Sequence, residues 1–244
     1  MQMAEEKMIG INSLTKKFGS LTAVSEVNLT INDNECFALL GLNGAGKTTL
    51  INMLTTQINP TSGDAQINGF DLVKDKDKIR KIINISPQES AVAKNLTVRE
   101  NLDLIASLYD VKDKDKVISS IIDEFGLREK ENVLCKKLSG GQLRRLSIAL
   151  AIITSPQILF LDEPTLGLDV KARKLLWSII EKLKKSMTIL LTTHYLEEVE
   201  FLADKIAIIS KGKIKAVGSP QEIITQTGKE TLEQAFLDLT EEEQ

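Results

Sequence analysis

The chain has 244 residues, a length that allows one large domain or two small ones and is ample for a buried core. Lys and Arg number 31 against 34 Asp and Glu, so the net charge of -3 supplies no cationic excess for a nucleic-acid backbone. Aromatic residues make up only 4% of the sequence, which disfavours base-stacking surfaces. We therefore expect a globular protein whose partners do not include nucleic acid.

Nothing in the sequence predicts a membrane span or a secretory signal. No run of 18 apolar residues occurs, and the opening residues Met1–Lys7 lack the basic and then apolar pattern of a signal peptide. Cys36 and Cys135 lie far apart without metal-site spacing, so we expect two plain thiols in a reducing compartment. These features predict a cytoplasmic location.

The first 35 residues predict an antiparallel β layer. Segments Gly10–Leu14 and Ala23–Ile31 are strand-like, and apolar side chains alternate at Val27, Leu29 and Ile31. Cys36–Leu40 is different, because a continuous apolar run indicates a strand that is buried on both faces.

Further apolar runs alternate with helical stretches along the rest of the chain. The strand-like runs are Ile158–Leu161, Ile189–Leu191 and Ile206–Ile209, and the helical stretches cover about 47–56, 141–154, 170–185 and 195–202. Buried strands that alternate with helices predict an α/β fold with a mostly parallel sheet.

Residues 89–154 have helical periodicity and no convincing strand, which predicts a helical insertion. Thr97 and Glu100 form a capping-box pattern, so a helix should start there, with Val98, Leu102, Ile105 and Leu108 on its buried face. A second helix is expected over Lys116–Phe125. We interpret the chain as a single domain: 8–88 and 155–220 form the α/β core with its β layer, 89–154 the helical subdomain, and 221–244 a helical tail.

A phosphate-binding loop is predicted between the buried strand at 36–40 and the helix that follows it. Residues 41–49 fit the pattern G-x-x-x-x-G-K-[ST], in which glycines let backbone N–H groups converge on phosphate oxygens. Lys47 would bind the β- and γ-phosphates, and the Thr48 hydroxyl would bind Mg²⁺. A glycine-rich turn is the alternative. The candidate binding residues are Asn43, Gly44, Ala45, Gly46, Lys47, Thr48 and Thr49.

Two acidic residues end the apolar run at 158–161. Asp162 is placed to hold Mg²⁺, and Glu163 to polarise an attacking water as general base. A plain acidic turn before Pro164 is the alternative. The segment Leu138–Gln142 has the sequence LSGGQ and precedes a helical run, so Ser139 is expected either to cap that helix or to help bind an anion there.

Together these motifs resemble the nucleotide-binding subunit of an ATP-binding-cassette (ABC) transporter, and the resemblance extends from about residue 8 to residue 220. In the family's order come a Walker A loop at 41–49, a Q-loop at Gln88, a signature at 138–142, a Walker B strand at 158–162, a D-loop at 167–169 and a switch histidine at His194. The resemblance implies a P-loop NTPase fold and an ATPase that uses ATP and Mg²⁺.

The resemblance also implies roles for individual side chains. Gln88 would contact the metal and the attacking water, and His194, the only histidine, would contact the γ-phosphate beside Glu163. Phe18 occupies a position where the family commonly stacks an aromatic ring on adenine, and a core residue of the β layer is the alternative. Asp169 would contribute to the nucleotide site, as would the signature residues Ser139, Gly140, Gly141 and Gln142.

Finally, the resemblance implies partners. Two nucleotide-binding subunits, identical or different, would enclose two ATP molecules head to tail, on the cytoplasmic face of a membrane. A separately encoded permease would dock near residues 88–98, and the tail at 231–240 resembles the drug- and antibiotic-resistance exporter branch. The alternative is a non-transport ABC ATPase that acts on ribosomes or DNA, which the single cassette, the short 88–139 segment and the acidic composition disfavour.

Overall fold

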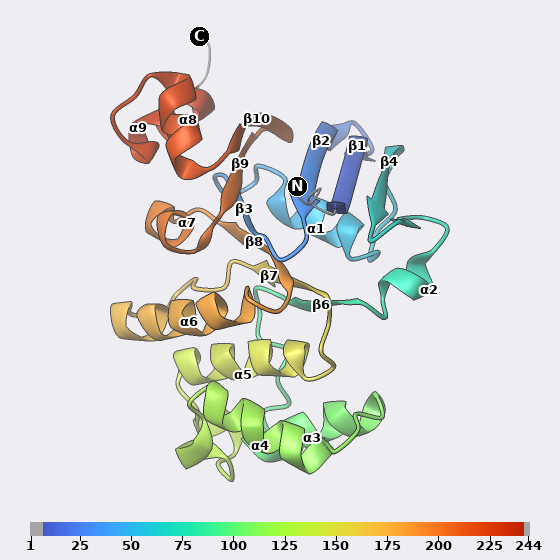
Figure 1. Ribbon diagram of the computed structural model, residues 1–244, viewed down its shortest axis with the longest axis vertical. Helices are drawn as coiled ribbons and strands as arrows, with labels where there is room; N and C mark the ends of the chain where they lie inside the picture. The colour runs from blue at the N-terminus through green and yellow to red at the C-terminus, as the bar shows by residue number, and fades with distance from the viewer. Residues whose placement is uncertain (1–6, 242–244) are drawn as a thin grey trace, which may run out of the picture.

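The computed structural model describes residues 7–241, which form two packed sheets flanked by helices (Figure 1). The smaller sheet is antiparallel, with the strand order β2-β1-β4-β5. Its strands are β1 (Lys7–Phe18), β2 (Leu21–Asn32), β4 (Ser62–Ile67) and β5 (Phe70–Asp71). The predicted N-terminal β layer is therefore confirmed, although β4 and β5 were not predicted from the sequence.

The larger sheet has six strands in the order β10-β9-β3-β8-β7-β6. All neighbours pair in parallel except β9 and β10, so the predicted mostly parallel sheet is confirmed. The strands are β3 (Cys36–Leu40), β6 (Ile83–Ser86), β7 (Ile158–Asp162), β8 (Thr188–Thr193), β9 (Lys205–Ser210) and β10 (Lys213–Gly218). Every residue of β3, β7 and β8 is buried, which explains their continuous apolar runs.

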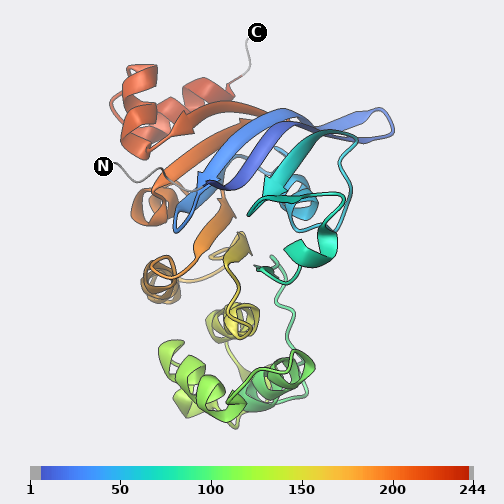
Figure 2. The same ribbon diagram turned by 45° about the vertical axis from the view of Figure 1, so that its right-hand side comes forward.

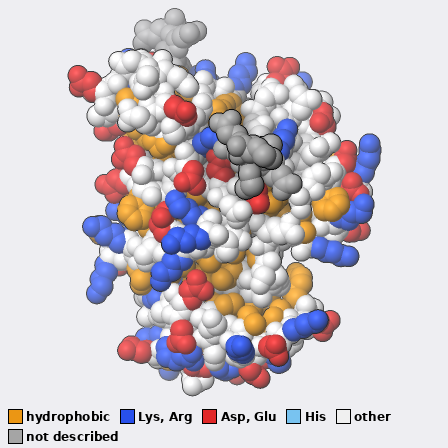
Figure 3. Space-filling model, viewed as in Figure 1, with side chains coloured by type: hydrophobic (Ala, Val, Ile, Leu, Met, Phe, Trp, Pro, Cys, Tyr) orange, Lys and Arg blue, Asp and Glu red, His pale blue; other side chains and the backbone are white. Residues whose placement is uncertain are grey.

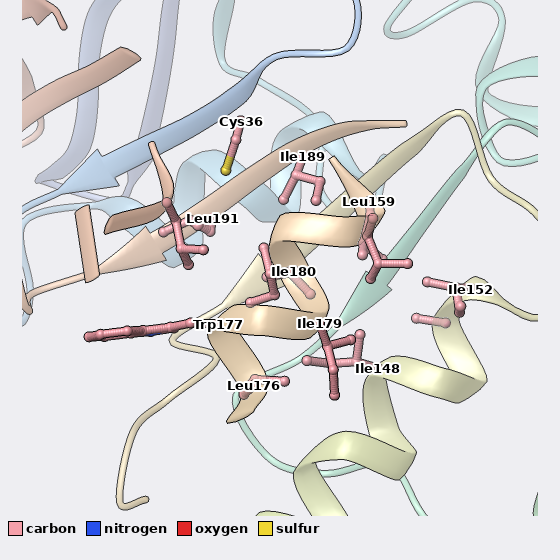
Figure 4. Packing of buried hydrophobic residues seen from close by; sticks show 14 of the residues in the cluster. Cys36, Ile148, Ile152, Leu159, Leu176, Trp177, Ile179, Ile180, Ile189 and Leu191 are labelled. Atoms are coloured by element: carbon pink, nitrogen blue, oxygen red, sulfur yellow. The ribbon is translucent and has the colours of Figure 1, made fainter. Parts of the chain in front are cut away.

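Alternation along β3 divides the interior into two clusters. Phe37 and Leu39 face the cluster that holds the antiparallel sheet and α1 (Lys47–Leu54), whereas Cys36 and Ala38 face the cluster that holds most of the other helices. Figure 4 shows α6 (Val170–Leu183) in that second cluster, with its apolar face between the sheet and α5 (Gly140–Ile152).

The helical insertion forms a separate body below the sheets (Figure 2). It contains α3 (Val98–Leu108) and α4 (Lys114–Glu124), and α5 connects it to β6 and β7. The remaining helices are α2 (Lys76–Ile79), α7 (Leu196–Leu202), α8 (Pro220–Thr227) and α9 (Leu232–Thr240). The last two form the expected tail, of which residues 242–244 lie outside the described residues.

The capping box of Thr97 and Glu100 is present at the start of α3, as predicted. The expected buried position of Leu108 is wrong, because 71% of this residue is exposed. Val98, Leu102 and Ala106 make the buried stripe instead. At about 100° per residue, Leu108 lies roughly a third of a turn away from the centre of that stripe.

Two smaller predictions also need correction. The second insertion helix starts at Lys114 rather than Lys116. The edge strand β10 has the polar sequence KIKAVG and an alternating exposure, so it lacked the apolar signal of the central strands. Across residues 7–241, none of the helices combines the length and the apolar character that crossing a bilayer requires.

Candidate active site

The phosphate loop connects the end of β3 to the start of α1. Gly44 and Gly46 have φ values of 82° and 108°, a region that glycine enters without strain. A Cβ atom on Gly46 would lie 2.5 Å from the carbonyl oxygen of Ala23, so a larger residue does not fit there. The loop therefore delivers the unpaired N–H groups at the α1 N-terminus to one point, which is an anion-binding geometry.

Lys47 is buried at the base of this loop, with 6% of the residue exposed. Its Nζ atom donates to the carbonyl oxygens of Gly41 and Leu42, at 2.7 and 3.2 Å. The same atom lies 3.0 Å from Glu163 Oε1. The side chain is thus held in position by two backbone carbonyls and a carboxylate.

Asp162, at the end of β7, gathers two hydroxyl groups. Thr48 Oγ1 donates to Asp162 Oδ2 at 3.2 Å, and Thr192 Oγ1 donates to Asp162 Oδ1 at 2.5 Å. Hydroxyl and carboxylate oxygens suit Mg²⁺, which usually takes few protein ligands together with phosphate oxygens. Thr48 and Asp162 therefore suit a Mg²⁺ ion whose other ligands come from a bound phosphate. Among the described residues, no group of three or more His, Cys, Asp and Glu side chains is placed to hold a metal ion.

Glu163 follows immediately, with a φ of 46° that is unusual for a residue with a side chain. Its Oε2 atom lies 2.8 Å from His194 Nδ1, and its backbone N–H donates to Thr192 Oγ1 at 3.0 Å. Strained backbone of this kind is commonly retained where side chains must be aimed for function. The Glu163 carboxylate therefore bridges Lys47 on one side and His194 on the other.

These groups open into a cavity of about 700 Å³. All the predicted loop residues from Asn43 to Thr49 line it, together with Gln88 and Glu163. Phe18 lies at its edge with 50% of the residue exposed, which leaves a ring face free to stack on a planar group. Asp162 and His194 do not line the cavity themselves, but they contact Thr48 and Glu163, which do.

The signature segment lies elsewhere. Ser139 and Asp169 do not line this cavity, and each caps a helix: Ser139 and Gln142 form a capping box at α5, and Asp169 Oδ1 accepts from Ala172 N at 2.8 Å. Gly140 lies in the same exposed first turn of α5 as Gly141, on which a Cβ would come within 2.9 Å of Ala172 Cβ. The starts of α5 and α6 are therefore neighbours.

Two residues of the site were not predicted from the sequence. Thr192 orients both Asp162 and Glu163, and a Thr-Thr pair at the end of an apolar strand was the only available signal. Arg144 of α5 is buried and donates to the backbone carbonyls of Pro87, Gln88, Asp162 and Pro164. Burial lowers the pKa of Arg144 to about 10, and the charge of Asp162 acts in the opposite direction.

Comparison with known proteins agrees with this geometry. The sequence profile of the family described as "ABC transporter" matches residues 24–166, more than half of the chain. The chain belongs to the ABC transporter family. It is an ABC ATPase domain, and it is 41% identical over 225 residues to ABC transporter A family member 6 of Dictyostelium discoideum and 39% identical over 217 residues to ATP-binding cassette sub-family A member 2 of Rattus norvegicus.

Solved structures of ABC proteins have the same fold. A structure titled as the ATP binding subunit of an ABC transporter has a TM-score of 0.86 at 28% identity, covering 96% of this chain and 100% of its own. A dimeric ATP-binding cassette in a post-hydrolysis state, bound to ADP and Pi, has a TM-score of 0.77 at 27% identity, covering 87% of this chain and 98% of its own. The match covers 90% and 87% of this ABC domain for the two relatives above, but only 14% and 9% of those longer proteins.

Proposed function

We propose that this ABC domain hydrolyses ATP in order to drive transport through a membrane partner, and that it works as a dimer. The observation that carries the proposal is the division of the site. Lys47, Thr48 and Glu163 line one cavity, whereas Ser139, at the exposed N-terminus of α5, does not line it. A second copy, identical or different, would supply its Ser139–Gln142 segment and Asp169 to complete the site.

Within one copy, the chemistry follows from the charges in the cavity. Lys47 and the N-terminus of α1 would neutralise the β- and γ-phosphates, and Thr48, Asp162 and Gln88 would hold Mg²⁺, which supplies further charge neutralisation. Glu163 would accept a proton from the attacking water. His194, 2.8 Å from Glu163, would orient that carboxylate and contact the γ-phosphate.

Bound ATP would hold two copies together. Its triphosphate is negatively charged and helix N-termini attract anions, so each ATP would be bound by the phosphate loop of one copy and the α5 N-terminus of the other. Cleavage would remove that shared ligand and let the copies part, which is the step that performs work. Phe18 would stack on the adenine at the edge of the cavity.

A groove of about 600 Å³ lies between the sheets and the helical body, and we propose it as the docking site of the membrane partner. Its apolar walls include Tyr109, Val111 and Ile153, and Figure 3 shows hydrophobic side chains in the hollow between the two bodies. Arg80 and Lys112 add positive charge. A short amphipathic segment with acidic residues would fit this lining. The expected docking region at 88–98 contributes no residue to the groove, so this proposal moves the docking site away from it.

The direction of transport is proposed to be export, from the resemblance of the tail. The relatives named above are A family members, so they lend no particular support to the drug- and antibiotic-resistance branch. The partner is proposed to be an integral membrane permease encoded separately, with this domain on the cytoplasmic face. Because the matched segment is a small part of those relatives, a membrane part in the same chain is the competing arrangement.

A complementation experiment tests the dimer. Lys47→Ala disables the phosphate loop of a copy, and Ser139→Arg places a bulky cation where the other copy's ATP would bind. Each variant alone should be inactive, but an equal mixture should recover up to about one quarter of the wild-type rate, since half of the dimers then contain one intact site. A mixture no more active than its components would overturn the proposal, provided that circular dichroism shows both variants folded.

A second experiment tests transport. The tagged chain, solubilised with detergent from its own cells, should co-purify with an integral membrane protein, and Arg80→Glu with Lys112→Glu should abolish that association. Lys213→Glu, an exposed change on β10 away from the groove, is the matched control. Retention on ribosomes or DNA with no membrane protein bound would favour the non-transport alternative instead.

A further inference from the structure

Helices α6 and α7 meet through a cluster of aromatic and charged side chains beside the site. Arg173 of α6 lies over two rings: its guanidinium carbon is 5.6 Å from the ring centre of Tyr195 and 5.7 Å from that of Trp177. A cation within about 6 Å of a ring centre is attracted to the ring face. Arg173 Nη2 also lies 3.7 Å from Glu197 Oε2, so one side chain of α6 contacts two residues that follow His194.

Trp177, one turn further along α6, makes a second set of contacts with α7. Its Nε1 atom donates to Glu198 Oε1 at 3.1 Å, and its ring stacks on Phe201 with centres 5.1 Å apart. Figure 4 shows Trp177 extending from α6 on the side away from Ile148 and Ile152, the α5 residues that pack on the opposite side. The indole therefore serves the contact with α7 rather than the contact with α5.

Glu198 is fully buried, which is unusual for a carboxylic acid. One of its oxygens accepts a hydrogen bond from Trp177. Burial raises the pKa of Glu198, and hydrogen bonds from Thr193 and then Trp177 act in the opposite direction. Such a group is costly to bury, and its position four residues after His194 ties the start of α7 firmly to α6.

Tyr195 connects this cluster to His194 and Glu163. The rings of His194 and Tyr195 lie 4.1 Å apart, and His194 Nδ1 lies 2.8 Å from Glu163. Moving Tyr195 off Arg173 would thus allow the imidazole to turn away from the carboxylate. The N-terminus of α6, which Asp169 caps, lies next to the start of α5.

We propose that Arg173 and Trp177 are positioning residues that hold His194 against Glu163 through Tyr195 and Glu198. This inference rests on the proposed function and adds a control of the same site: the helix that starts at Asp169 sets the orientation of the histidine. A change at the start of α6, which would face the second copy, would therefore alter the orientation of His194 without contact between the nucleotide and α6.

Arg173→Met tests the proposal, because it keeps the length of the side chain and removes its charge. We expect kcat for ATP hydrolysis to fall about tenfold while KM stays within about twofold. Arg173→Lys should recover part of the loss, since it retains the charge without the flat guanidinium. Lys174→Met, an exposed neighbour on α6, is the matched control and should leave kcat unchanged.

A double-mutant cycle separates positioning from a general structural effect. If Arg173 acts through His194, adding Arg173→Met to His194→Ala should change the single-turnover rate by less than about twofold. A multiplicative loss, or a wild-type kcat in Arg173→Met, would overturn the proposal. Trp177→Phe, which keeps an aromatic side chain of smaller size and removes the N–H donor, supplies a second variant that should also lower kcat with KM unchanged.

Trp177 is the only tryptophan of the chain, so its fluorescence reports directly on this cluster. Arg173→Met should shift the emission, and Lys174→Met should not; unchanged emission in both would contradict the contact. The complementation of Lys47 and Ser139 variants does not involve Arg173. If the complementation succeeds and the double-mutant cycle shows a multiplicative loss of rate, only the positioning role is rejected. If the complementation fails, the dimeric function is rejected.

Discussion

Lys47 Nζ lies 3.0 Å from Glu163 Oε1, and only 6% and 7% of the two side chains are exposed. The cation expected to bind phosphate and the carboxylate expected to activate water therefore neutralise each other in this structure. A triphosphate entering the cavity would compete for Lys47 and release one oxygen of Glu163. This exchange links nucleotide binding to the freeing of the base, because Lys47 would exchange the carboxylate for a phosphate while Glu163 keeps its contact with His194.

Glu163→Gln should separate binding from hydrolysis. The amide keeps the shape of the carboxylate but cannot accept the proton of the attacking water, so hydrolysis should fall by about a hundredfold or more. Phosphate release measures the rate, and size-exclusion chromatography with ATP should reveal accumulated dimer. The exposed Glu200→Gln, on α7, is the control. A wild-type rate for Glu163→Gln would remove the assignment of the base.

Lys47→Ala should weaken ATP binding. The substitution removes the phosphate-facing cation and leaves the Glu163 carboxylate buried without its partner, so both the attraction and the electrostatic balance of the cavity are lost. We expect the dissociation constant to rise at least about tenfold, equivalent to about 1.4 kcal/mol. Titration calorimetry measures it, with the exposed Lys213→Ala as control. Unchanged affinity would mean that another group binds the phosphates.

Arg144→Gln should reduce both stability and activity. The guanidinium of Arg144 bridges backbone carbonyls before and after Glu163 and in the Gln88 loop, and its loss leaves buried acceptors without donors. We expect the free energy of unfolding to fall by about 2–4 kcal/mol, measured by denaturant titration, with a lower kcat.

The neighbouring Arg145 offers a matched comparison for that change. It donates to the carbonyls of Phe125 and Gly126, which lie in the helical body and away from the cavity. Arg145→Gln should therefore reduce stability while kcat in the folded fraction stays near wild type. Equal losses of kcat in the two variants would show that Arg144 has no special relation to the site.

The ion pairs of Glu131 in the helical body should stabilise the fold less at acidic pH. Hydrogen bonds from Arg99 and then Arg128 lower the pKa of Glu131 below its usual value near 4. The folded state therefore favours the carboxylate, and the resulting stability is present above the unfolded pKa and is lost as pH falls through the folded pKa. Glu131→Gln should lower Tm at pH 7, and the difference from wild type should shrink below about pH 4.

Thermal unfolding followed by circular dichroism across pH measures this effect. Glu129→Gln is the control, because Glu129 is exposed and two positions away in the same segment. A Tm difference for Glu131→Gln that stayed constant from pH 7 to pH 3 would show that the stabilisation does not come from the ionised carboxylate.

Local rules predicted much of this fold because the relevant signals are short-range. The buried strands β3, β7 and β8 are continuous apolar runs, and the capping boxes at Thr97 and Ser139 follow from residues three apart. The loop from Asn43 to Thr49 has a pattern whose geometry depends mainly on its own glycines. In these cases the residues that fix the structure are neighbours in the sequence.

Features that depend on distant contacts were not predictable in the same way. Leu108 follows a helical period but lies off the stripe that the rest of the protein covers, and β10 is recognised only through its pairing with β9. The residues around Arg144 in the sequence give no sign that it is buried. Its burial results from loops that are 20 and 57 residues away. Only the assembled fold shows that its charge belongs to the site.

Thr192→Val tests a second residue of that kind. Thr192 Oγ1 donates to Asp162 and accepts from the backbone N–H of Glu163, so one hydroxyl fixes both acidic residues from the adjacent strand. Valine keeps the shape and removes the hydroxyl, which should cost about 1–3 kcal/mol of unfolding free energy because the buried Asp162 carboxylate loses a donor. The N–H of Glu163 would keep only the backbone carbonyl of Thr192. Hydrolysis should fall as Asp162 loses its orientation. Thr192→Ser restores the hydroxyl and should recover the rate; if serine were no better than valine, the methyl group and not the hydrogen bonds would be the reason that threonine is needed there.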